Sequence, residues 1–151
     1  MIHLQTNIER SVYFWLESIF SPYPHIKVLD SYPEDELEVS SIVLLPQEIL
    51  IEPFEFGNRR GLYRRFWTIH IYAENDTQRN DFAYKILDYL EDRINVYDYN
   101  FGFPPLNSPP QIGVLLPDRI KYFPMEVISN KSDKLFWMGE ISFYTFYESL
   151  T

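Results

Sequence analysis

The chain has 151 residues, of which 46% are hydrophobic and 18% aromatic, so its composition predicts one folded domain with a buried core. It contains no cysteine, which excludes disulfide frameworks, thiolate nucleophiles and cysteine-ligated zinc. The formal net charge of −9 argues against sequence-independent binding to DNA or to an anionic membrane, because that binding needs a positive surface.

The first predicted element is an amphipathic helix over residues 6–20, "TNIERSVYFWLESIF". Thr6 and Glu9 have the spacing of a capping box, in which each side chain pairs with an unpaired amide at the helix start. An apolar stripe at helical spacing predicts the buried face, and the helix is expected to stop before Pro22. The residues of this stripe are Leu4, Ile8, Val12, Trp15 and Ile19.

Four strands are predicted next, at residues 25–30, 39–45, 48–56 and 63–73, with an acidic loop at 31–38. Pro46 and Pro53 are expected at strand ends or edges. The clearest strand is 63–73, where Trp67, Ile69, Ile71 and Ala73 alternate with Phe66, Thr68, His70 and Tyr72. The stretch around Gly57 and Gly61, between the last two strands, is predicted to be a hairpin connection.

A second helix is predicted after Asn75 or Asp76, either of which can cap it. Arg79 is expected on its polar outer face. Its expected buried stripe consists of Phe82, Ala83, Ile86, Leu87, Leu90 and Ile94.

A proline- and aromatic-rich loop is predicted at about 99–117, and its part 99–110 is too aromatic for a flexible linker, so it is expected to pack. Two further strands are predicted at 119–128 and 134–148. The order of elements predicts a single α+β domain over 1–151, an antiparallel β-sheet with two helices packed on one face.

No arrangement of residues predicts an enzyme. The three histidines have no ligand spacing, and His70 is expected to be packed and hydrogen-bonded. Glu52 and Glu55 would point to opposite faces of a strand, so they do not form a metal-binding pair. We therefore expect no cofactor and no metal. Because no apolar run reaches roughly 18 residues and the N-terminus has no basic region, a soluble, unprocessed chain without a membrane segment is expected.

Residues 57–65, "GNRRGLYRR", concentrate four of the thirteen basic residues in an acidic chain. One interpretation is a solvated turn with intramolecular ion pairs, and another is an interface in which guanidinium groups pair with carboxylates of other copies. A nucleic-acid surface is a third, although one short hairpin is less basic than single-strand binders usually are.

The aromatic content favours an interface, since twelve Tyr, twelve Phe and three Trp exceed what a small core readily buries. In the last strand, Trp137 and Phe143 alternate with Phe136, Tyr144 and Phe146, so both faces should be covered. The candidate intersubunit residues are Arg59, Arg60, Tyr63, Arg64, Arg65, Phe101 and Phe103.

The stretch 65–92, "RFWTIHIYAENDTQRNDFAYKILDYLED", runs from a strand through a polar cap into a helix with Gln-Arg near its start. With the preceding helix and hairpin, it resembles the tail terminator or tail completion (neck) proteins of long-tailed bacteriophages over roughly residues 1–95. The segment 99–110 is not part of that pattern, which leaves the position in the neck open.

The resemblance implies a small α+β subunit of a virion ring, commonly a hexamer, assembled in the host cytoplasm. Such a ring caps the tail tube protein and docks it to the head–tail connector, and DNA passes through the lumen without specific binding. A head–tail joining or head completion protein is the alternative within this class. A small acidic intracellular binding module or inhibitor is the alternative from another class.

Overall fold

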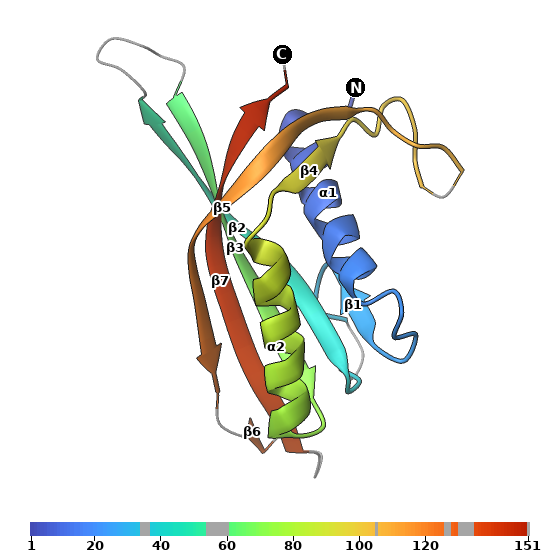
Figure 1. Cartoon of the computed structure of the whole chain (residues 1–151), viewed down its shortest axis with the longest axis vertical. Coiled ribbons are helices and arrows are strands. Elements are labelled where there is room, and N and C mark those ends of the chain that lie inside the picture. Colours follow the sequence, from blue (N-terminus) through green and yellow to red (C-terminus); the bar gives the residue numbers. More distant parts are fainter. Residues whose placement is uncertain (34–36, 54–60, 105, 126–127, 130–134, 151) are drawn as a thin grey trace.

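The computed structural model describes residues 1–33, 37–53, 61–104, 106–125, 128–129 and 135–150, and the side chains of 52–53, 61–63, 128–129 and 135–136 lie outside this description. Over these residues the chain is α+β, as predicted, with two helices and a mixed sheet that curls into a half-barrel (Figure 1). The elements are α1 (Leu4–Ile19), β1 (Lys27–Leu29), β2 (Ser41–Pro53), β3 (Gly61–Ala73), α2 (Asp76–Leu90), β4 (Ile94–Tyr97), β5 (Gln111–Pro124), β6 (Ile128–Ser129) and β7 (Leu135–Ser149).

The strand order is β1-β2-β3-β7-β5-β4, with β6 paired to β7. The prediction of an antiparallel sheet is wrong at one edge, because β1 pairs with β2 in parallel. The finer prediction, both helices packed on one face, stays a prediction: α2 contacts β3, β7 and β5, whereas α1 contacts β4 and β1, the two edge strands.

Two predicted strands are one strand. Residues 39–45 and 48–56 were expected to be separated at Pro46, but β2 runs through that proline, which pairs with Trp67. The register shifts between Pro46 and Ile49, so a bulge accommodates the residue that lacks a backbone N–H.

Other boundaries also differ from the sequence prediction. The predicted loop at 99–117 ends earlier, since β5 begins at Gln111 and contains Pro117. Ile94 belongs to β4, a strand that the sequence did not predict, rather than to the stripe of α2. The capping box is wrong as well: His3 is the N-cap of α1 and its Nδ1 accepts from the Gln5 N–H at 3.0 Å. Asn75 caps α2 as predicted.

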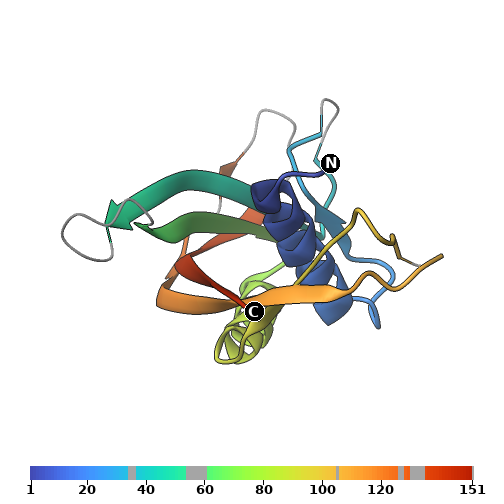
Figure 2. The same ribbon diagram turned by 90° about the horizontal axis from the view of Figure 1, so that it is seen from above.

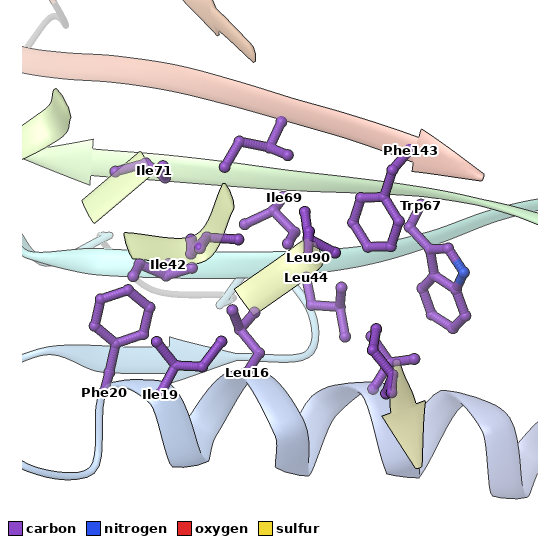
Figure 3. Close-up of a cluster of buried hydrophobic side chains, with 14 of the residues drawn as sticks. Leu16, Ile19, Phe20, Ile42, Leu44, Trp67, Ile69, Ile71, Leu90 and Phe143 are labelled. Atoms are coloured by element: carbon purple, nitrogen blue, oxygen red, sulfur yellow. The ribbon is translucent and has the colours of Figure 1, made fainter. Parts of the chain in front are cut away.

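One hydrophobic core takes side chains from both helices and from the sheet (Figure 3). Leu16 and Ile19 of α1 point toward the strands, where Trp67, Ile69 and Phe143 are buried. Phe20 meets Phe82 of α2 edge to face at 5.5 Å, which joins the two helices. Arg79 of α2 is buried, contrary to the outer position predicted for it. Its Nη1 donates to the Met125 carbonyl at 2.9 Å, so the buried guanidinium has a hydrogen-bond partner.

Candidate interaction surfaces

The ends of β2 and β3 form an arm, defined here as residues 49–53 and 61–65, whose outer part is two-stranded. β7 pairs with β3 only from Arg64 onward, so Gly61–Tyr63 pair with β2 alone among the described strands. In Figure 1 the arm extends away from β7 and β5 at the upper left. A two-stranded ribbon of this kind is marginally stable by itself in water.

The β2 strand of the arm exposes three successive apolar side chains. Ile49, Leu50 and Ile51 are 42%, 44% and 57% exposed. Successive side chains of a strand point to opposite faces, so Leu50 lies on one face and the two isoleucines lie on the other. The three apolar residues between Glu48 and Glu52 predict a strand, but they do not indicate whether its side chains are exposed.

Arg65 anchors the base of the arm inside the subunit. Its Nε donates to the Gln47 carbonyl at 2.8 Å, and its Nη2 pairs with the Glu9 carboxylate of α1 at 2.8 Å. The Nη1 donates to Gln5 at 3.2 Å, and the guanidinium lies 5.4 Å from the Trp67 ring. This buried side chain therefore joins β2, β3 and α1, and its donors are already used within the chain.

Arg64 points to the opposite face of β3, where an aromatic patch lies. Its guanidinium is 4.3 Å from the ring centre of Phe146, and the ring centres of Phe66 and Tyr144 lie 4.9 Å apart. These side chains are half-buried. Arginine beside tyrosine and phenylalanine is the composition enriched at interface centres.

The other predicted interface residues of the hairpin cannot be placed. Arg59 and Arg60 lie outside the described residues, and Tyr63 is described in its backbone only. The prediction for these three positions therefore stays a prediction.

The segment 99–110 packs on α1 and leaves an aromatic groove beside it. Tyr99 is buried and its N–H donates to the Asn7 side chain at 3.1 Å, while the Phe103 ring lies 5.6 Å from that of Phe14. The groove encloses about 590 Å³ between α1, β4 and this segment. Its lining is Ser11, Phe14, Trp15, Ser18, Arg93, Asn95, Tyr97, Tyr99, Pro104, Asn107, Ser108 and Pro109.

The same segment exposes apolar side chains near the groove. Phe101 is 75% exposed and Leu106 is 90% exposed. The described residues of the arm and the segment 99–110, which carries Phe101 and Phe103, lie on opposite sides of the molecule (Figure 2). Of the predicted interface residues whose side chains are described, Arg64 and Arg65 therefore lie at the base of the arm, and Phe101 and Phe103 lie in the segment 99–110.

A polar cluster joins residues 30–33 to the sheet. His70 Nε2 lies 3.2 Å from the Glu140 carboxylate, and its Nδ1 is hydrogen-bonded to the Tyr32 hydroxyl. That hydroxyl also pairs with Tyr72 at 2.6 Å, and burial together with this hydrogen bond raises the pKa of the Tyr72 phenol. His70 is thus packed and hydrogen-bonded, as the sequence predicted. None of these four side chains lines the aromatic groove. Their hydrogen bonds connect Tyr32 to β3 and β7.

Over the described ranges, no three His, Asp or Glu side chains gather closely enough to hold a metal ion. No helix of the described part is long and apolar enough to cross a bilayer.

Comparison with known proteins gives no assignment: no protein-family model matches the chain, and no curated protein matches its sequence.

Proposed function

We propose that the chain is a structural subunit of the neck of a long-tailed bacteriophage, a tail terminator or tail completion protein that assembles into a ring. In this proposal the ring, commonly a hexamer in the family that the sequence resembles, caps the tail tube protein and docks it to the head–tail connector. The virion neck is then its location, and neither catalysis nor a cofactor is part of its role.

The observation that carries the proposal is the apolar arm. Ile49, Leu50 and Ile51 are exposed on successive positions of β2 at the base of this arm. Ile49 and Leu50 pair with Arg65 and Arg64, which also pair with β7, and Ile51 lies where β2 and β3 continue without a third described strand. In this proposal, apolar surface of this kind on a chain with 22 acidic side chains is an interaction site. Arg65 supports the same role, because it fixes the base of the arm to α1 and so holds the arm in a defined direction.

The net charge and the expected packing of the helices are also compatible with a ring subunit. The net charge of −9 allows carboxylates to line a lumen and repel the DNA backbone. The proposal also includes the finer packing expected from the sequence, with both helices on one face, which leaves the aromatic patch of Arg64, Phe66, Tyr144 and Phe146 for a neighbouring protein.

Negative-stain imaging of the purified chain at high concentration tests the proposal. Closed rings with an axial hole wide enough for duplex DNA are the expected result. Position within the neck then follows from whether the rings bind the ends of tail tubes, as a terminator does, or connectors, as a head completion protein does. Isolated monomers that bind a basic partner protein would contradict the proposal and identify an acidic binding module.

A further inference from the structure

Two apolar surfaces lie on opposite sides of the subunit. The arm, with exposed Ile49, Leu50 and Ile51, is on one side, and the segment 99–110, which lines the aromatic groove and carries exposed Phe101, is on the other (Figure 2). Because of this separation, the arm cannot fill the groove of its own chain.

We propose that the aromatic groove is the receptor for the arm of a second copy of this chain, so that neighbouring subunits associate head to tail. The inference rests on the proposed function in that it assumes self-assembly, and it adds which two surfaces meet.

The groove has the chemistry to receive an apolar strand. Phe14, Trp15, Tyr97 and Tyr99 give it aromatic walls, against which branched aliphatic side chains pack well. Asn107 and other polar groups at the lining can pair with backbone groups of an incoming strand.

The arm offers such backbone groups. β1 pairs with β2 only at Ser41–Val43, so the outer edge of β2 in the arm has no described neighbour. An unpaired strand edge exposes N–H and C=O groups that pair readily with another chain. The opposite edge of the sheet differs, because Ser11 and Asn7 of α1 accept hydrogen bonds from the Tyr97 and Tyr99 amides.

Charge favours the same pairing. Exposed Arg93 lies in the groove lining, and exposed Glu48 adjoins the apolar residues of the arm. Contact between two arms would instead leave both grooves empty. Head-to-tail contact uses both surfaces of every subunit, and it produces a ring when the rotation closes.

Cysteine trapping tests the contact cleanly, because the chain has no cysteine of its own. Ile51→Cys places a thiol on the arm, and Asn107→Cys places one in the groove. The two variants, one with a size tag, are mixed and treated with an oxidant or a short bis-maleimide. A matched mixture replaces the groove variant with Asp88→Cys, an exposed position on α2.

The expected result is a mixed dimer of Ile51→Cys with Asn107→Cys, on the order of tenfold above the Asp88→Cys mixture, since a specific contact raises the effective thiol concentration. Ser18→Cys, on the helix side of the groove, should give the same adduct. Either adduct supports the inference even where a loss of folding removes the other.

Three results would overturn the inference: no adduct above the control, an adduct between two Ile51→Cys chains only, or equal reaction with Asp88→Cys. Imaging of the unmodified protein separates the two proposals. Rings without the arm–groove adduct would remove this contact and keep the proposed function, whereas absence of both rings and adduct would remove both.

Discussion

Two arginines, Arg65 and Arg79, are buried in a chain whose net charge is −9. Each satisfies its guanidinium with carbonyl or carboxylate oxygens and lies beside an indole ring, of Trp67 and Trp137 respectively. Planar guanidinium groups with several fixed donors suit such sites better than an ammonium group does. These two arginines therefore connect segments inside the protein by buried hydrogen bonds.

Replacing Arg65 with lysine should lower the free energy of unfolding by about 2 kcal/mol, because one ammonium group cannot reach Gln47, Gln5 and Glu9 together. Urea denaturation measures the change. Arg93→Lys is the matched control at an exposed position. Equal free energies of unfolding for the two variants would show that the contacts of Arg65 add no specific stability.

Asp98 makes the stability of the turn after β4 depend on pH. Hydrogen bonds from the backbone and then the side chain of Asn100 lower the pKa of its carboxyl below the ordinary 3.8. A lowered pKa in the folded state stabilises the fold above the unfolded value, and this contribution is lost as pH falls through the folded pKa.

Asp98→Asn should therefore be less stable than the natural chain at pH 7, and the difference should shrink below about pH 4. Urea denaturation at both pH values checks this, with Asp88→Asn on the exposed face of α2 as the control. A difference that does not change with pH would contradict the assignment of the effect to the charge of Asp98.

At the level of elements, α1 protects the β4 edge of the sheet. The Tyr97 N–H donates to Ser11 at 3.0 Å and the Tyr99 N–H donates to Asn7 at 3.1 Å. Tyr13 of the same helix donates to the Val28 carbonyl of β1 at 3.2 Å, so α1 contacts both edge strands of the half-barrel. Polar residues on the buried side of this helix thus have a specific use.

Ser11→Ala should leave the Tyr97 amide without its acceptor at a cost of about 1–3 kcal/mol. Hydrogen exchange at that amide, measured by NMR, should become faster, while exchange in β3 changes only as far as global stability does. Ser18→Ala, at an exposed position of α1, should change neither. Unchanged exchange at Tyr97 would contradict the capping role.

The sequence predicted elements whose pattern is local. The strand 63–73 and the helix after Asn75 were recognised because alternation and capping are local signals. β4 was missed because four residues, Ile94–Tyr97, directly after a helix carry too short a pattern. The parallel pairing of β1 with β2 was missed because the pattern within a strand does not state its neighbour's direction.

The candidate surfaces were only partly predictable for the same reason. Arg64 and Arg65 are adjacent in sequence, yet one lies at the aromatic patch and the other is buried against α1. The groove could not be predicted at all, since Phe14, Tyr97 and Asn107 come from three separate segments that only the fold brings together.

At the scale of the whole molecule, the sheet separates at one end into two parts. β2 and β3 leave as the arm, whereas β7 continues with β5 beyond Phe146, where it pairs as far as Ser149 with Gly113 (Figure 1). This separation places the arm on one side and the groove on the other. A subunit with different contact surfaces on opposite sides can form a closed ring or an open filament.

Solution mass by light scattering, over a range of protein concentrations, tests most directly whether the arm drives assembly. The natural chain should reach a defined multiple of 18.2 kDa. The double variant Ile49→Gln/Ile51→Gln should stay at the monomer mass with an unchanged circular dichroism spectrum, because it removes exposed apolar surface that the proposed contact would bury. Tyr89→Gln, at an exposed position of α2, should assemble like the natural chain. A natural chain that remains at 18.2 kDa throughout, or an arm variant that assembles equally well, would contradict the account.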